Sequence, residues 1–265
     1  MRRHREYLKG TARDQAFEYA NYLELLVSLH HDCDEVWDCS SEPTAPPEPP
    51  VRLTRNEVSA QTYQRGFLGF TCGVKQQWAA REAAVRNAIA ADDRQYQLDM
   101  SEYNRQSEHR AYVQHLAEAV AARQLDGCRA ALDYTGAFDE LALFNTRVRL
   151  QSVAGGIATI DCVIEDHAAV PDEVAASRYS SLYRAHVASS AIRIAREVFA
   201  TLSAVQVVTN IRAHRRPFSI LDATFTRDAF VGVDMESIDP SAWITCFVHR
   251  HATRAVQDHW RVAEK

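Results

Sequence analysis

The segment SLHHDCDEVWDC, residues 28–39, is the part of the chain densest in side chains that can do chemistry. It contains two histidines, two cysteines and four acidic residues. Imidazole, thiolate and carboxylate groups are the ligands that zinc takes in proteins, so the segment raises the question of a metal site. His30 and Cys33 are three residues apart, and on a helix both side chains would point the same way.

A complete zinc site would need more ligands than this first pair. Structural zinc sites usually combine two ligand pairs. Asp38 and Cys39 would have to fold back on the first pair, and the next candidates are the histidines of the HRH motif at 249–251. Cys33 and Cys39 do not match the Cys-x-x-Cys spacing of a redox pair either. We therefore expect no metal at His30 and Cys33, and predict that they end a helix and pack against the C-terminal part of the chain.

Other groups suited to acid–base or metal chemistry lie on predicted strands or at their ends. Residues 165–167, Glu-Asp-His, leave a strand and are typical of a turn. Asp161 and Asp222 could act like the sheet-borne carboxylates of metal-dependent nucleases, but the nearby Glu-x-Lys that commonly accompanies them is missing. The chain also lacks the glycine-rich, nucleophile-elbow and HExxH motifs. We therefore expect no cofactor and assign no catalytic residue.

The basic residues leave a second hypothesis open. Arg212, Arg215 and Arg216 lie in a predicted hairpin, and Arg250 lies near the C-terminus. If these side chains converged in space they could contact phosphates. The net charge of −5 gives no general attraction to nucleic acid, so solvated surface charge is the simpler interpretation.

The N-terminal part of the chain consists of a predicted helix and a linker. Residues 14–30 have apolar side chains at helical spacing, which places an N-terminal helical segment within residues 1–40. Residues 43–50 contain five prolines. Proline removes a backbone donor and favours extended conformations, so residues 41–73 are predicted to be a proline-rich linker at the surface.

Residues 74–144 form a predicted helical or coiled-coil region. No glycine or proline occurs between residues 74 and 123. Four apolar residues spaced seven, four and seven apart form a seam: Trp78, Val85, Ile89 and Tyr96. The polar run at residues 104–110 is the expected place for a break or bend. A long amphipathic helix needs a partner, which would be its own second half, a second copy of the chain or another protein.

Residues 145–265 predict an α+β domain. Two alternating apolar segments flank Gly155 and Gly156, which indicates a hairpin. A helix over residues 177–203 follows, then two further strands, and a last helix that Asp239 caps and Pro240 begins. This order predicts a small antiparallel α+β sandwich of the type ββαββα, so the fold class is α+β.

Cysteine usage and hydropathy bear on location. The six cysteines are scattered over the chain, and no long stretch is free of charge. Dense cysteine frameworks and apolar leaders mark exported proteins, so the pattern predicts a reduced, cytoplasmic protein without a membrane span.

Three C-terminal segments carry a resemblance to a known family: IRIAREVFATLSAVQVVTNIRA, SILDATFTRDAF and SIDPSAWITCFVHR. They resemble the C-terminal region of a family of uncharacterised bacterial proteins, some of which carry an N-terminal domain of unknown function. LVSLHHDC matches a Leu-His-x-x-Cys element of that family, and YTGAFDEL is also similar. The chain departs from it at Cys39, where the family has tryptophan, and in the short loop AHRR. The resemblance implies a bacterial, cytoplasmic protein with a helical region before an α+β domain. It implies no activity.

Two functional hypotheses follow from these observations. The first is a non-enzymatic interaction or scaffold protein that binds protein partners, or itself, through the long helix. The second is a nucleic-acid-binding protein or nuclease that acts in bacterial phage defence or on mobile elements.

Overall fold

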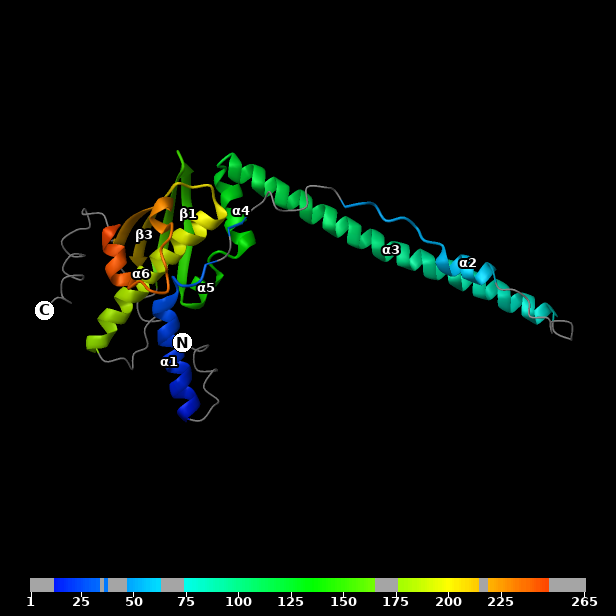
Figure 1. Ribbon diagram of the computed structural model, residues 1–265, viewed down its shortest axis with the longest axis horizontal. Coiled ribbons are helices and arrows are strands. Elements are labelled where there is room, and N and C mark those ends of the chain that lie inside the picture. Colours follow the sequence, from blue (N-terminus) through cyan, green and yellow to red (C-terminus); the bar gives the residue numbers. More distant parts are fainter. Residues whose placement is uncertain are drawn as a thin grey trace. The chain divides into compact units, whose positions relative to one another are not determined.

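The computed structural model describes residues 12–33, 36–37, 47–62, 74–164, 176–214 and 219–247 (Figure 1). It describes side chains in these ranges except at 12–18, 74–77 and 176–180. The chain divides into two compact units. The sheet unit comprises residues 1–38 and 116–265, and the helical unit comprises residues 39–115. This division places residues 116–144 with the sheet, whereas the sequence suggested a boundary at residue 144.

Helices and strands both contribute, and the predicted α+β class is confirmed. The longer helices are α1 (Ala12–Ser28), α3 (Val74–Ala121), α4 (Leu125–Thr135) and α6 (Ala176–Thr201). The short helices are α2 (Arg55–Gln61), α5 (Asp139–Leu143) and α7 (Pro240–Trp243), with 3-10 turns at Arg227–Phe230 and Ile244–Cys246. The strands are β1 (Thr146–Ala154), β2 (Ile157–Ile164), β3 (Gln206–Ala213) and β4 (Ser219–Thr226).

The four strands form one mixed sheet in the order β1-β2-β3-β4. The outer pairs are antiparallel, but β2 and β3 are parallel. The prediction of an antiparallel sheet is therefore wrong for the central pair. The reason is the connection through α6, which returns the chain to the end of the sheet where β2 began, as parallel neighbours require.

The core of the sheet unit lies between the sheet and α6, which crosses one face of the sheet (Figure 1). Alternate strand residues such as Ile160, Ile211 and Phe225 are fully buried on this face. Alanines and an isoleucine of α6, including Ala188 and Ile192, meet them. Small helix residues let the helix approach the sheet closely, which favours dense packing.

The predicted start of the last helix is confirmed. The Asp239 carboxylate accepts a hydrogen bond from the Ser241 backbone N–H at 2.9 Å, and Pro240 occupies the first turn. The α-helix itself ends at Trp243. Trp243 and Phe247 pack against the ring of Phe225, which fixes this segment to the core.

In the helical unit, α3 is continuous over all 48 of its residues, so the break predicted at residues 104–110 is wrong. At 1.5 Å per residue this helix is about 70 Å long. An ion pair within the helix joins Glu102 to Arg105 at 2.7 Å, and Gln106 also donates to Glu102. These hydrogen bonds lower the pKa of Glu102 to about 2. Such pairs at helical spacing support a helix through a polar stretch.

The short helix α2, which the sequence pattern does not indicate, lies along α3. Asp92 of α3 is buried and accepts hydrogen bonds from the backbone N–H groups of Asn56 and Glu57, at 3.4 and 3.0 Å. These are N–H groups that the first turn of a helix leaves without intrahelical partners. They lower the pKa of Asp92, the Glu57 N–H contributing most. Arg81 donates to the carbonyl of Gln61 at the other end of α2, so the two helices run antiparallel.

Candidate functional site

His30 and Cys33 lie on a segment that follows α1 and packs on α6. His30 is almost fully buried, and its backbone N–H donates to the Ser189 hydroxyl oxygen at 2.9 Å. The same oxygen lies 2.9 Å from His30 Nδ1. Because Ser189 Oγ accepts from the backbone, its own proton is free to donate to Nδ1. His30 is therefore held as a neutral ring by a serine of the C-terminal half of the chain.

Further hydrogen bonds fasten the same segment along α6. The Arg196 guanidinium donates to the backbone carbonyls of His30 and His31. The backbone N–H of Trp37 donates to the Ala200 carbonyl at 3.0 Å. Residues 28–33 and 36–37 thus cover α6 from Ser189 to Ala200. We call this described part of residues 28–37 the N-terminal strap.

A buried ion pair lies beneath the strap. Arg193 Nε is 2.6 Å from Glu197 Oε1, and both side chains belong to the face of α6 turned away from the sheet. Glu197 is fully buried and Arg193 is 5% exposed, while Glu140 reaches Arg193 at 3.4 Å from the surface. Removing either partner would leave a charge in a poorly solvated place.

Burial controls the ionisation of the groups in this layer. It raises the pKa of the Cys33 thiol to about 12, and the neighbouring Glu197 carboxylate acts in the same direction. A thiol with such a pKa remains protonated and is a poor nucleophile or metal ligand. Burial also lowers the pKa of His30 and of His186, whose Nδ1 lies 3.1 Å from the Leu26 carbonyl, to about 4.

The two histidines make the stability of the sheet unit depend on pH. A folded pKa near 4 against an ordinary 6.5 means that the unfolded chain binds protons more readily. Stability is therefore complete above pH 6.5 and falls as the pH drops from 6.5 towards 4, by up to about 3 kcal/mol for the fully buried His186 and by less for His30. We expect the urea midpoint to fall over this range. His186→Gln should flatten the dependence, whereas His115→Gln, at an exposed site on α3, should leave it unchanged.

Two adjacent buried serines on α6 provide a matched test of the strap. Ser189 bridges to His30, whereas Ser190 Oγ is buried without a hydrogen-bond partner among the described residues. Ser189→Ala should lower the free energy of unfolding by about 1–2 kcal/mol, because it leaves the His30 N–H and ring nitrogen without a partner. Ser190→Ala should be neutral or stabilising. Equal losses in urea unfolding would contradict the hydrogen-bond assignment.

Of the four arginines in the second hypothesis, the structure describes only Arg212. Arg212 is on β3 and pairs with Asp161 of β2 at 3.3 Å. Arg215, Arg216 and Arg250 lie outside the described residues. So do several other candidates from the sequence, namely Asp38, Cys39, residues 165–167, His249 and His251.

On the face of the sheet opposite α6, charged residues that are far apart in the sequence lie close together. The strand register aligns Arg149, Asp161, Asn210 and Asp222 in one row across all four strands. Arg147 and Arg212 fall in the next row. Asp222 accepts a hydrogen bond from Ser219 at 2.6 Å. Each carboxylate thus has a partner of its own, while Arg147 and Arg149 are exposed.

The predicted seam of α3 is partly covered within the helical unit. Val85, Ile89 and Tyr96 are half-buried, whereas Trp78 is 49% exposed. Val85 and Ile89 lie between Arg81 and Asp92, the two residues that hold the ends of α2. α2 therefore lies beside this part of the seam, a neighbour that the sequence pattern does not indicate.

Sequence reasoning also missed the polar face of α6. It considered His30 and Cys33 as site candidates but gave no such role to Ser189, Arg193 or Glu197. A polar stripe opposite an apolar one ordinarily indicates a solvent-facing surface. The signal that could have revealed burial is the apolar helix before the strap, whose Leu26 and Leu29 need a surface to cover.

Comparisons with protein-family models, curated proteins and solved structures gave no match. The resemblance to an uncharacterised bacterial family therefore stays a prediction. Within the described ranges, no three His, Cys, Asp or Glu side chains lie close enough together to hold a metal ion. No described helix combines the length and apolar character needed to cross a membrane.

Proposed function

We propose that the protein is a non-enzymatic interaction or scaffold protein whose helical unit pairs with a second copy of the chain. One observation carries the proposal. The helical unit has six of the thirteen exposed large hydrophobic side chains, although it contains fewer than a third of the described residues. They are Val51, Leu53, Val58, Trp78, Leu98 and Tyr112. Exposed apolar side chains concentrated in one part of a protein favour an interface.

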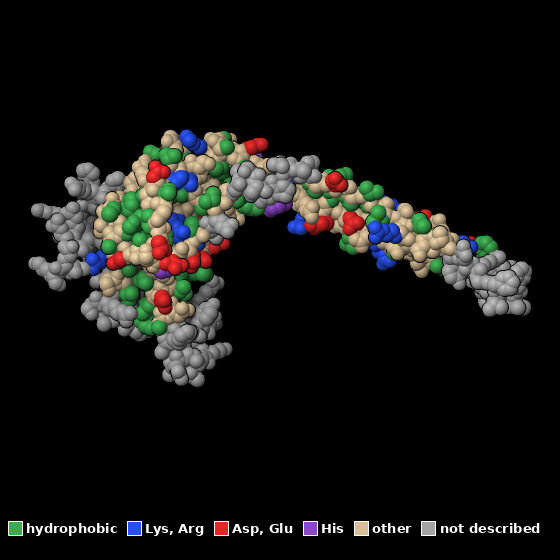
Figure 2. Space-filling model, in the orientation of Figure 1, with side chains coloured by type: hydrophobic (Ala, Val, Ile, Leu, Met, Phe, Trp, Pro, Cys, Tyr) green, Lys and Arg blue, Asp and Glu red, His purple; other side chains and the backbone are tan. Residues whose placement is uncertain are grey.

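The charges of α3 support a second copy as the partner. Residues 78–115 carry five arginines and six acidic residues, mixed along the helix. Figure 2 shows both signs of charge among hydrophobic side chains on this unit. A nearly neutral surface of mixed charge does not repel its own copy, whereas a strongly basic or acidic partner would gain little from it. In this proposal the exposed apolar side chains of the helical unit, and not the part of the seam beside α2, form the contact between the two chains.

The setting of this activity follows from the family resemblance alone. The resemblance supports a bacterial origin and a cytoplasmic location for the protein. The sheet unit and its strap would then present a second surface to other proteins.

Co-expression of tagged and untagged copies tests the pairing. The tagged chain should retain the untagged chain on an affinity resin through high-salt washes. Trp78→Ala combined with Leu98→Ala should abolish retention. Glu82→Ala combined with Gln97→Ala changes two exposed polar residues of the same helix and should not. Equal retention by both double variants would contradict the proposed surface.

A second candidate function is nucleic-acid binding through the open face of the sheet. Its support is that Arg147 and Arg149 of β1 and Arg212 of β3 all lie on that face. Phosphate contacts make binding strongly salt-dependent. Fluorescence anisotropy with labelled single- and double-stranded DNA and RNA tests this candidate. Arg147→Ala combined with Arg149→Ala should weaken binding and make the affinity depend less steeply on salt concentration. No binding at low salt would exclude this candidate.

A further inference from the structure

The N-terminal strap brings three basic side chains together on α6. The rings of His30 and His31 lie edge to face, with their centroids 4.4 Å apart. The Arg196 guanidinium donates to the backbone carbonyls of both histidines. Protonation of either ring therefore adds a positive charge close to a guanidinium that holds the same two residues in place.

His30 is the member of this cluster that is shielded from solvent. It is 1% exposed, and the Ser189 hydroxyl lies 2.9 Å from its Nδ1, where it donates to the neutral ring. A protonated ring carries a hydrogen on Nδ1 and can no longer accept this hydrogen bond. The closed strap therefore favours the neutral form of His30, through burial and through its contact with Ser189.

The surroundings of His30 offer no ion pair that would balance its charge. The backbones of Val27 in α1 and Ile238 lie close enough to favour the charged ring, but burial, the charge of His31 and that of Arg196 outweigh them and lower its pKa to about 4. Among the described residues, no carboxylate forms an ion pair with His30. The titratable and charged groups on the elements around the ring are Glu24 of α1, His31 and Asp32 of the strap, His186, Arg193, Arg196 and Glu197 of α6, and Asp234, Glu236 and Asp239 beside Ile238.

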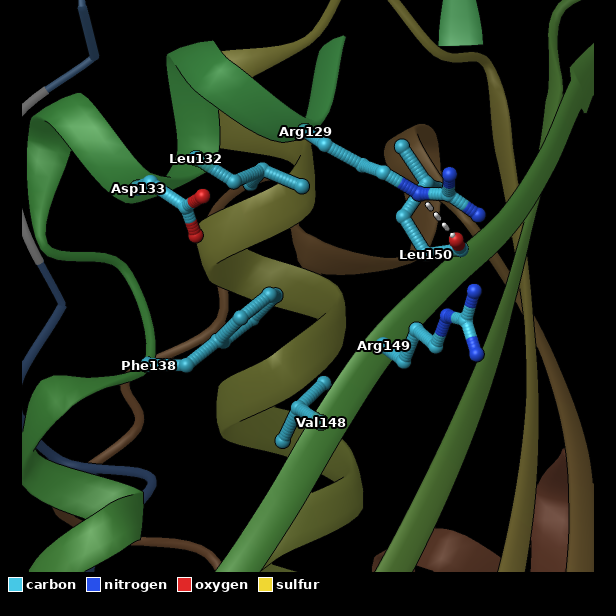
Figure 3. A pocket seen from close by; sticks show the side chains of 7 residues that line it. All are labelled: Arg129, Leu132, Asp133, Phe138, Val148, Arg149 and Leu150. Carbon is cyan, nitrogen blue, oxygen red and sulfur yellow. Dashed lines mark hydrogen bonds between the residues drawn. The ribbon is translucent and has the colours of Figure 1, made fainter. Parts of the chain in front are cut away.

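The cavity between α4 and β1 has a different balance of charge. This cavity of about 230 Å³ is lined by Arg129 and Asp133, which carry opposite charges, and by apolar side chains (Figure 3). Arg129 donates from Nε to the Leu150 carbonyl at 3.0 Å, the contact that Figure 3 marks with a dashed line. The three basic groups at the strap have one sign, so the strap is the place in the sheet unit where added protons act against a contact.

We propose that the N-terminal strap is a pH-sensitive segment, which leaves α6 in mildly acidic solution while the core of the sheet unit stays folded. In the open form the His30 ring reaches water and binds a proton with its ordinary affinity. The open form therefore binds protons more readily than the closed form, so opening increases as the pH falls below about 6.5. The device lies in the sheet unit and is independent of pairing through the helical unit.

The strap can open without the core because different interactions hold the two. The printed contacts of the strap with α6 are hydrogen bonds, such as the one from the Trp37 N–H to the Ala200 carbonyl. The core beneath α6 is a continuous cluster of buried apolar residues, which do not titrate. Opening of a segment held by few contacts costs less free energy than unfolding of the whole domain. Opening uncovers the polar face of α6 with Ser189 and Arg193.

Labelling of the cysteines with a dipyridyl disulfide tests the proposal on the full chain. Cys33 belongs to the strap, whereas Cys128 and Cys162 are almost fully buried in the core of the sheet unit. Peptide mass spectrometry gives the rate at each cysteine, which is divided by the rate of the same cysteine in the urea-unfolded chain at the same pH. Between pH 7 and pH 5 this ratio should rise about five- to twentyfold at Cys33, as the pKa of His30 requires, and stay unchanged at Cys128 and Cys162.

Two histidine variants identify the group that controls the strap. His30→Asn keeps an oxygen that can accept from Ser189 but takes up no proton, so the ratio at Cys33 should become independent of pH. His186→Gln is the matched control, because it removes another buried histidine of the sheet unit and should leave the rise at Cys33 in place.

Three results would overturn the proposal. The ratio at Cys33 stays constant between pH 7 and pH 5, or it rises together with the ratios at Cys128 and Cys162, which means unfolding of the whole unit. The third is the same rise in His30→Asn as in the unaltered chain. The comparison of the three cysteines in the unaltered chain decides between opening and unfolding even if His30→Asn loosens the strap at every pH.

Discussion

Replacing Glu197 by glutamine should lower the free energy of unfolding by about 3–5 kcal/mol. The substitution keeps the shape of the side chain but removes the charge that lies 2.6 Å from Arg193. Arg193 would remain charged and 5% exposed beneath the N-terminal strap, with only the more distant Glu140 at the surface. The measurement is the urea midpoint and slope by circular dichroism.

A double variant separates the charge from the packing. Arg193→Met combined with Glu197→Leu removes both charges and keeps similar volume, and should recover most of the lost stability, because a well-packed apolar pair avoids the desolvation of two ions. Glu102→Gln is the surface control, since its partner Arg105 stays solvated, and it should leave the unfolding midpoint nearly unchanged. A loss below about 1 kcal/mol for Glu197→Gln would mean that Arg193 reaches solvent when the strap moves.

The Arg193–Glu197 pair illustrates why the layer beneath the strap could not be predicted. Periodicity located α6 within a residue or two of its observed bounds, because an apolar stripe repeats at helical spacing. The opposite stripe is polar, and polarity indicates exposure unless another element covers it. The covering strap comes from more than 150 residues earlier in the chain, as in the contact between His30 and Ser189. No local pattern connects segments so far apart.

The parallel direction of β2 and β3 could not be predicted from the sequence pattern for a similar reason. The alternation of apolar residues that predicts β2 and β3 is the same for parallel and antiparallel pairing. What decides the direction is the path of α6 between Ile164 and Gln206. The hairpin at Gly155 and Gly156 could be predicted, because both residues adopt the positive φ angles that tight turns require.

The second large effect concerns Ile89. Ile89→Ala should destabilise the helical unit by about 1–3 kcal/mol, less than a fully buried isoleucine because Ile89 is only half-buried. The loss should appear whether or not two chains pair, since the chain's own α2 lies along this part of α3. Arg86→Ala, on an exposed position of the same helix, should change stability by no more than about half a kcal/mol. The measurement is thermal unfolding followed at the helix signal.

Trp78 and Leu98 should behave differently from Ile89. Both are about half-exposed or more, so each loses little packing within one chain when it is replaced by alanine. Their substitution should instead weaken association between chains. The melting temperature of the unaltered chain should rise with protein concentration, and that of Trp78→Ala combined with Leu98→Ala should not. A concentration-independent melting temperature in the unaltered chain would argue against a second copy.

The contact between Asp92 and α2 shows why α2 could not be predicted from the sequence. A single acidic residue within a long polar helix ordinarily faces solvent, and the seven residues of α2 form too short a segment to show helical periodicity. The carboxylate of Asp92 caps α2 from a neighbouring helix 35 residues away in sequence. Only the fold brings these groups together.

Sedimentation velocity of the full chain over a hundredfold range of concentration tests the central claim most directly. If the helical units pair, the unaltered chain should sediment at twice its mass of 29.9 kDa at high concentration and dissociate on dilution. Trp78→Ala combined with Leu98→Ala should sediment as a single chain throughout, and Glu82→Ala combined with Gln97→Ala as the unaltered protein. A chain that sediments at 29.9 kDa at every concentration would contradict pairing through the helical unit.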